Sequence, residues 1–380
     1  MMLGLLLARA GVRTLVLEKH ADFLRDFRGD TLHPSTLEVM AELGLLERLL
    51  ELPHDRVPEI AAQFGDTLLK VADFRHLPTR CGFIAMMPQW DFLNFLAREA
   101  ARYPAFGLQM NTEVTSLIER DGRIAGVNGM EADLVIGADG RHSTVRRLAG
   151  LEVQSHGAPI DVLWFRLRRD PRDPDTSMGR FDAGAAFVLI NRRDYWQCGY
   201  VIPKGAADSV RSAGLPAFQK TLARLVPWAA NRAHEIAGWE EVKLLTVQID
   251  RLKRWWRPGL LCIGDAAHAM SPVGGVGINV AIQDAVAAGN VLGRGDFSDQ
   301  RLKRIQRRRE WPVRLTQRLQ ILAQDRIITR VLRSSEPLEP PLLFRWLTRF
   351  ALLRRIPGRL IGMGLRPEHV RVTKVSSADD

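Results

Sequence analysis

The stretch GLLCIGDAAHAMSPVGGVGINVAIQDA, residues 259–285, decides the fold of this chain of 380 residues. Residues 260–263 form a short apolar run bounded by glycines, which is typical of a buried parallel strand. Gly264 and Asp265 follow at its carboxyl end, the edge at which open α/β sheets bind their ligands. Asp265 is therefore expected to accept hydrogen bonds from the hydroxyl groups of a sugar-like ligand.

A glycine-rich turn and a helix complete this stretch. The glycines at 274, 275 and 277 let the backbone approach a flat ligand closely, because they carry no side chain. A helix is expected from Asn279 to Leu292, and its amino end carries partial positive charge. The turn and the helix start together favour a ligand that carries negative charge.

A second stretch, DLVIGADGRHSTVR at residues 133–146, repeats the arrangement of apolar strand, glycine and acid. The acid is Asp139, and Ser143 is expected to cap the amino end of the helix that follows. The two stretches therefore predict two halves of one binding site.

Both stretches resemble the DG and GD fingerprints of the class A flavoprotein monooxygenases, a family with the p-hydroxybenzoate hydroxylase fold that includes ubiquinone-biosynthesis hydroxylases. The resemblance spans nearly the whole chain. It implies an α/β protein with an FAD/NAD(P)-binding Rossmann-like domain, an inserted α+β substrate domain and C-terminal helices. The implied boundaries are 1–150 with 257–300 for the FAD-binding domain, 151–256 for the substrate domain and 301–380 for a basic helical region.

The first twenty residues, MMLGLLLARAGVRTLVLEKH, resemble only part of the unit with which this family opens. They match its helix and second strand, with Glu18 expected to bond a ribose hydroxyl, whereas the N-terminal strand and the GxGxxG loop are lacking. Either a start codon lies upstream of Met1, or the chain is a deletion product with a weakened cofactor site. The first explanation is favoured because the rest of the pattern is intact.

The resemblance also assigns the other cofactor contacts. Arg28 and Gln89 are expected near the flavin, and Val114 is expected to reach the adenine through its backbone. The remaining predicted contacts are Asp139 and Arg141 on the pyrophosphate side, Gly264 and Asp265 at the ribityl chain, and the backbone of Gly277, Ile278 and Asn279 at the flavin pyrimidine. Pro272 is expected to line the space where oxygen reacts.

No catalytic base or metal site is identified, and His268 is expected to be structural.

The implied function is that of an FAD-dependent monooxygenase. NADH or NADPH would reduce FAD, and the reduced flavin would trap O2 as a C4a-hydroperoxide that hydroxylates an aromatic or quinone-precursor substrate. The sequence has no GxSxG, GxxxxGK[ST] or HExxH motif, so hydrolase, P-loop and zincin chemistry are disfavoured. Two alternatives stay open: a flavin-dependent reductase on the same fold, and a truncated, inactive protein that no longer binds FAD.

Residues 151–256 are the predicted substrate part. The segments VLWFRLRR, GAAFVLINRR and YWQCGYVIP have strand patterns, and a helical stretch is expected from Leu215 to Ile236. Six of the nine tryptophans lie here, which suits a small aromatic substrate, although only one or two are expected to face it.

The net charge of +11 resides in the C-terminal region, since residues 301–380 hold 19 Lys and Arg against 7 Asp and Glu. Helices that pack on the enzyme body and leave arginines in water explain this pattern. Peripheral contact with an anionic membrane is the alternative, and nucleic acid is disfavoured because the rest of the chain is nearly neutral. Three widely spaced cysteines fit a reducing cytoplasm, where we expect the protein, with possible peripheral attachment to the inner face of the membrane.

Overall fold

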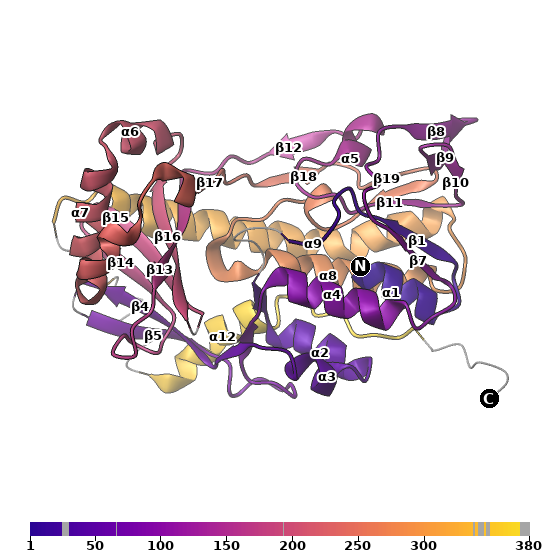
Figure 1. Ribbon diagram of the computed structural model, residues 1–380. Helices are drawn as coiled ribbons and strands as arrows, with labels where there is room; N and C mark the ends of the chain where they lie inside the picture. Colours follow the sequence, from indigo (N-terminus) through magenta and orange to yellow (C-terminus); the bar gives the residue numbers. More distant parts are fainter. Residues whose placement is uncertain are drawn as a thin grey trace.

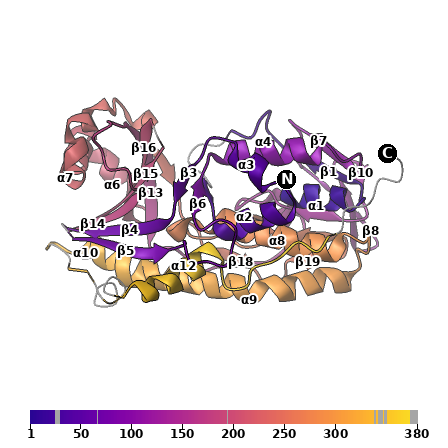
Figure 2. The same ribbon diagram turned by 90° about the horizontal axis from the view of Figure 1, so that it is seen from below.

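The computed structural model describes residues 1–24, 30–65, 67–192, 194–336, 339–340, 346 and 350–372. They form two lobes, a parallel-stranded lobe that contains the N-terminus and a lobe built on a large, mostly antiparallel sheet (Figure 1). A small sheet of β2 (Thr31–Leu32), β6 (Ile84–Met86) and β3 (Asp55–Val57) lies between the two lobes (Figure 2).

The parallel strands form two separate sheets. One pairs β1 (Thr14–Leu17) with β7 (Phe106–Gln109), and the other has the order β11 (Val135–Gly137), β20 (Leu260–Cys262), β19 (Trp256–Arg257). Among the described residues, nothing pairs with the second edge of β1 or of β11.

Three helices cover these strands, α1 (Met2–Arg9), α4 (Gln89–Ala100) and α8 (Gly277–Leu292). A Cβ atom on Gly4 of α1 would come within 2.8 Å of Val16, so glycine is needed for this close packing of helix on strand. Gly11 has φ +78° and ends α1, as expected for a residue after a helix. α8 begins two residues earlier than expected. The segment Val273–Leu292, which ends with α8, is long and apolar enough to span a membrane by composition, but α8 packs on α1 and the core.

The second lobe is a sheet of seven strands in the order β17-β13-β16-β15-β14-β4-β5. Their bounds are β17 (Lys243–Leu245), β13 (Ile160–Arg168), β16 (Tyr195–Pro203), β15 (Ala185–Asn191), β14 (Met178–Asp182), β4 (Glu59–Phe64) and β5 (Thr67–Asp73). The three strands expected from the sequence are confirmed. β4 and β5, however, come from a segment that the sequence analysis placed in the FAD-binding domain, and they join here because β4 pairs in parallel with β14.

Helices cover one face of this sheet. They are α6 (Ala207–Ser212), α7 (Leu215–Leu225) and a 3-10 segment (Pro227–Glu235). The helical stretch expected from Leu215 to Ile236 is thus found as α7 followed by the 3-10 segment. The two are separated at Val226, since Pro227 lacks the N–H that would continue α7. Trp196 is fully buried and packs against Trp228 within this core, with the ring planes tilted by 54°, so neither of these two forms an open aromatic wall.

The shorter elements complete the framework. They are α2 (Pro34–Glu42), α3 (Leu46–Leu50), β8 (Leu117–Arg120), β9 (Arg123–Val127), β10 (Met130–Glu131), α5 (Thr144–Leu148), β12 (Val153–Ser155), β18 (Asp250–Leu252) and 3-10 turns at Trp239–Glu241, Gly264–Ala266, Val273–Gly275 and Ala351–Arg354. The predicted hairpin at Asp121-Gly122 joins β8 to β9, and both turn residues have positive φ.

The C-terminal region supplies a long helix beneath both lobes (Figure 2). α9 (Asp299–Ala323) continues through a π-helical turn (Gln324–Ile328) into α10 (Thr329–Arg333), and α12 (Arg355–Gly362) lies against β5. α9 buries Leu302, Ile305 and Val313 on the body, as the packing interpretation of the sequence expected. Its buried face also carries Gln306, Gln317 and Gln320.

Candidate active site

The acid after β20 lies beside the arginine after β11. Asp265 sits in the 3-10 turn that follows β20, and an Asp265 carboxylate oxygen is 3.9 Å from Nη2 of Arg141. Gly264 has φ +58° and donates its N–H to Asp284 at 3.0 Å, which fixes the turn. The parallel pairing of β11 with β20 thus brings together the two motifs that the sequence predicted to share a site.

Asp139 stabilises the turn that presents Arg141. Its carboxylate accepts hydrogen bonds from Oγ of Ser143 at 2.5 Å and from the N–H of Val145 at 3.0 Å. Ser143 in turn caps α5 by accepting the N–H of Arg146, as expected. Because both carboxylate oxygens are engaged in this turn, the structure gives Asp139 an orienting role, and Arg141 is the charged group at its rim.

The glycine turn packs tightly on the segment before α2. Gly274 and Gly275 have φ +79° and +63°, and a Cβ atom on Gly275 would lie 2.7 Å from Oγ1 of Thr31. Thr31 donates its hydroxyl to the carbonyl of Gly275 at 2.8 Å. A larger residue at 275 would push these segments apart, so glycine is required here by both backbone angle and space.

Asn279 joins the glycine turn to α2. Its Oδ1 accepts from the N–H of His33 at 2.8 Å and from Oγ1 of Thr36 at 2.7 Å, and its Nδ2 donates to the carbonyls of Thr31 and Gly275. The side chain is thus fully occupied within the protein. Any contact of Asn279 with a cofactor falls to its backbone, as the sequence analysis expected.

The amino end of α8 is open. No side chain of the described residues caps it, and the first N–H groups of a helix, here those of Gly277, Ile278 and Asn279, have no acceptor within the helix. Such an end attracts negative charge. Pro272 lies at the start of the same turn, half-buried.

The remaining predicted contacts border the parallel strands. Glu18 ends β1, and its charge acts on the amino group of Met1 at the start of α1. Gln89 begins α4 and donates its N–H to Asp30 at 3.3 Å. Val114 is half-buried against the core of the same lobe. Arg28 lies outside the described residues. The contacts of all these residues with a cofactor stay predictions.

His268 is held in a buried charge network that the sequence analysis did not identify. Its Nε2 is 2.5 Å from Asp284, which also accepts from Nε of Arg309 at 2.9 Å. All three side chains are at most 3% exposed. Glu368 continues the network, 3.6 Å from Arg309. This arrangement gives His268 a structural environment, because the ion pair ties the loop after β20 to α8 and α9.

Gln320 of α9 holds both sides of Pro272. Its Nε2 donates to the carbonyls of Ser271 at 2.9 Å and of Val273 at 2.8 Å, and its Oε1 accepts the N–H of Ser271 at 3.2 Å. The side chain is buried. Gln320 was not identified from the sequence, because a glutamine on an arginine-rich helix indicates neither its burial nor its partner segment.

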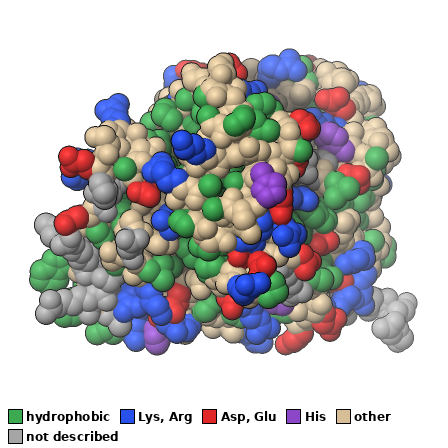
Figure 3. All heavy atoms as spheres, turned by 60° about the vertical axis from the view of Figure 1, so that its left-hand side comes forward, with side chains coloured by type: hydrophobic (Ala, Val, Ile, Leu, Met, Phe, Trp, Pro, Cys, Tyr) green, Lys and Arg blue, Asp and Glu red, His purple; other side chains and the backbone are tan. Residues whose placement is uncertain are grey.

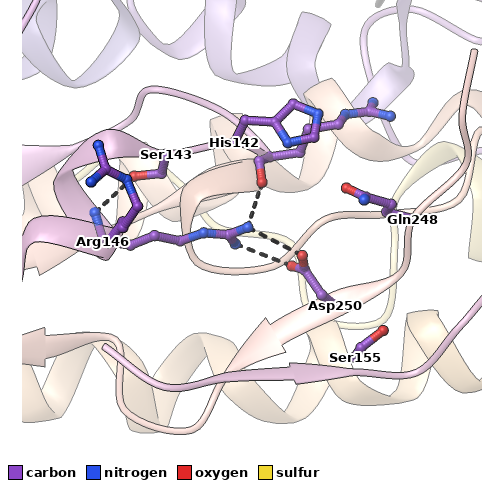
Figure 4. Close-up of a pocket in the computed structure, with 8 residues that line it drawn as sticks. His142, Ser143, Arg146, Ser155, Gln248 and Asp250 are labelled. Carbon is purple, nitrogen blue, oxygen red and sulfur yellow. Dashed lines mark hydrogen bonds and ion pairs between the residues drawn. The ribbon is translucent and has the colours of Figure 1, made fainter. Parts of the chain in front are cut away.

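An open cavity of about 470 Å³ lies next to the turn of Asp139. Figure 4 shows Arg146 pointing toward Asp250, and both residues line the cavity. Arg141, His142 and Arg147 line it as well. Arg146 is buried and paired with Asp250 at 3.3 Å, so its charge is balanced. Arg147 and His142 are exposed, which makes the cavity suitable for an anionic group.

These features together define a flavoprotein of the dinucleotide-binding class. FAD fits the residues present: Asp265 and Arg141 stand at the adjacent strand ends, the glycine turn admits a flat ring, and the uncapped α8 faces the same turn.

Comparison with known proteins supports this class. Residues 1–316 match the family described as FAD binding domain. The chain is 31% identical over 371 residues to 6-methylpretetramide 4-monooxygenase of Streptomyces rimosus, which covers 93% of this chain and 88% of that protein. It is 27% identical to rifampicin monooxygenase of Streptomyces venezuelae over 73% of this chain, but spans only 58% of that relative. The fold of p-nitrophenol 4-monooxygenase of Pseudomonas putida DLL-E4 superimposes with a TM-score of 0.77 at 19% identity, covering 96% and 95% of the two chains.

The chain belongs to the FAD-binding-domain family of flavoprotein monooxygenases. The α/β fold, the FAD cofactor and the FAD-dependent monooxygenase class expected from the sequence are thereby confirmed.

Proposed function

We propose that this protein hydroxylates an aromatic, phenolic or enolic substrate with O2, using NADH or NADPH as the electron donor. The observation that carries the proposal is the near full-length similarity to a protein named 6-methylpretetramide 4-monooxygenase. Bound FAD supplies the redox chemistry that activates oxygen. The protein must then bind the substrate, orient it and exclude water.

The chain's own residues suit these tasks. The open amino end of α8 stabilises negative charge, Asp265 and Arg141 bind polar groups at the strand ends, and Gln320 keeps Pro272 in place. The test uses FAD-loaded protein with NADH or NADPH and 18O2, with anthrone-type phenols as substrates. Incorporation of one 18O atom into the product supports the proposal. Reduction of the substrate without oxygen incorporation would instead establish the reductase alternative.

The cavity beside Asp139 is proposed to receive the phosphates of the electron donor. Its rim carries the exposed Arg147, whose side chain is not part of the Asp265 site. Replacing Arg147 by Gln is expected to raise KM for the donor by about 3- to 10-fold, since a charge-assisted hydrogen bond is lost, while kcat stays within about twofold. Steady-state donor oxidation measures both. Arg294→Gln, at an exposed arginine beyond α8, is the control, and an unchanged KM in Arg147→Gln would refute this placement.

We further propose a cytoplasmic protein that touches an anionic membrane through its C-terminal helices. The outer face of α9 exposes Trp311, Leu319 and Leu322, at 57%, 42% and 52%. Arginines flank them, and Ile356 and Leu360 of α12 are also exposed. Figure 3 shows apolar side chains interspersed with basic and acidic ones over the end of the molecule that bears the seven-stranded sheet. The exposed apolar side chains of α9, flanked by arginines, are suited to an anionic lipid surface.

Sedimentation with vesicles tests the membrane proposal. The protein is expected to sediment with phosphatidylglycerol vesicles and not with phosphatidylcholine vesicles, and salt should release it because the attraction is partly electrostatic. The double variant Trp311→Ser and Leu322→Ser should bind at least about fivefold more weakly, since it removes exposed apolar area. Equal binding to both kinds of vesicle, or to neither, would argue against the proposal.

A further inference from the structure

A buried ion pair joins the two lobes next to the predicted flavin turn. Oδ2 of Asp30 is 2.5 Å from Nη2 of Arg192, and the two side chains are 11% and 5% exposed. Arg192 follows β15 in the seven-stranded sheet, whereas Asp30 immediately precedes β2 of the small sheet that lies between the lobes. The pair is the kind of contact expected where a substrate-binding sheet meets the cofactor lobe.

Its surroundings place it close to the residues assigned to the flavin. Asp30 accepts the N–H of Gln89, and its neighbour Thr31 is hydrogen-bonded to Gly275 in the glycine turn. Burial raises the pKa of Asp30, and the charge of Arg192 only partly opposes this. The pair is therefore held in a poorly solvated environment between the predicted flavin contacts and the substrate sheet.

One nitrogen of the Arg192 guanidinium makes no hydrogen bond to the described residues. Its Nε donates to Oε1 of Gln197 at 3.0 Å and its Nη2 to Asp30, and Gln197 also hydrogen-bonds Asp30. Nη1 is buried, and no residue in the described part of the chain accepts a hydrogen bond from it. Burying a charged donor without an acceptor costs free energy. We therefore expect a group outside the described protein residues to accept a hydrogen bond from Nη1.

We propose that Nη1 of Arg192 binds a single phenol or enol oxygen of the substrate and so orients its ring at the flavin turn. This inference rests on the proposed hydroxylase function. A carboxylate ligand favours two parallel hydrogen bonds from an arginine, but Nη2 is already taken by Asp30. The adjacent Asp30 carboxylate would also repel a second negative oxygen. A ligand with one oxygen, either hydroxyl or singly charged, therefore matches the site better.

The test compares the binding of 1-naphthol and 1-methylnaphthalene, in which a methyl group that cannot accept a hydrogen bond replaces the hydroxyl group. FAD-loaded wild type is expected to bind the naphthol more tightly by on the order of 10-fold or more, as a hydrogen bond to a charged donor allows. Arg192→Met should bring the ratio of the two dissociation constants close to one, mainly because the variant binds the naphthol more weakly. Arg192→Lys, which keeps a charge opposite Asp30, should also lower the ratio and guards against misfolding of the methionine variant. Calorimetry on each protein gives both constants.

Arg168→Lys is the matched control, because Arg168 lies on the same sheet but is paired at the surface with Glu235. Its ratio should equal that of wild type. Folded Arg192 variants that keep the wild-type ratio would overturn the proposal, as would a wild-type protein that binds both compounds equally or neither of them. Failure of the hydroxylase function appears separately, as absence of 18O in products of the wild-type protein, whatever the binding ratio.

Discussion

Replacing Asp284 by asparagine is expected to lower the free energy of unfolding by about 3–5 kcal/mol, because it removes the carboxylate closest to the buried Arg309 and leaves only Glu368, 3.6 Å away, opposite that cation. Asp284 is fully buried and receives hydrogen bonds from Arg309, His268 and the N–H of Gly264. Arg309 itself is only 3% exposed, so water cannot replace the lost carboxylate. The same change should loosen the turn that carries Asp265.

Urea unfolding followed by circular dichroism measures the loss. Glu119→Gln serves as the control, since Glu119 pairs with Arg257 at the surface and surface pairs contribute at most about 1 kcal/mol. A loss for Asp284→Asn no larger than that of the control would show that the network does not stabilise the fold.

The same variant should change how stability depends on pH. Burial raises the pKa of Asp284, but the charges and hydrogen bonds of His268 and Arg309 outweigh it and hold the pKa below its ordinary value. A carboxyl with a depressed pKa contributes stability above its unfolded value of about 3.9, and this contribution is lost as pH falls through the folded value. Wild type should therefore lose more stability on acidification than Asp284→Asn, over the range below about pH 4.

The positions of the acids that follow the parallel strands were predictable from the sequence. The carboxyl ends of parallel strands lie at the same edge of a sheet, so the sequence alone placed Asp139 and Asp265 at that edge. The caps at Ser143 and Gly11 were predictable for a similar reason, since they depend on neighbours within a few residues.

Contacts between distant segments were not predictable in this way. The sequence gives no indication that β4 would pair with β14, since a strand pattern shows which face is buried and not which partner is chosen. Asp284 and Arg309 lie on different helices, and their charges suggested solvent rather than a buried pair. Arg192 likewise stands in a run of basic residues, and only the fold shows that it meets Asp30.

Gln320→Met is expected to uncouple donor oxidation from hydroxylation. The glutamine makes three hydrogen bonds to the backbone on both sides of Pro272, and methionine has a similar length but cannot make them. The turn next to Pro272 would then relax, and a shift of about 1 Å at a reacting centre can cost on the order of 100-fold in rate. We expect hydroxylated product per donor oxidised to fall by about 10-fold or more, with hydrogen peroxide as the alternative product.

The comparison with a surface glutamine on the same helix separates this effect from a loss of stability. Gln300 is exposed at the start of α9, so Gln300→Met should leave the yield of product unchanged. Bound FAD, measured by absorbance after gel filtration, should be retained in both variants, because neither side chain lies among the predicted cofactor contacts. A Gln320→Met protein that keeps its flavin and its full product yield would show that the position of Pro272 does not depend on this clamp. If flavin is kept while peroxide replaces product, the clamp acts on the geometry of the oxygen step, since cofactor binding and overall folding are then unchanged.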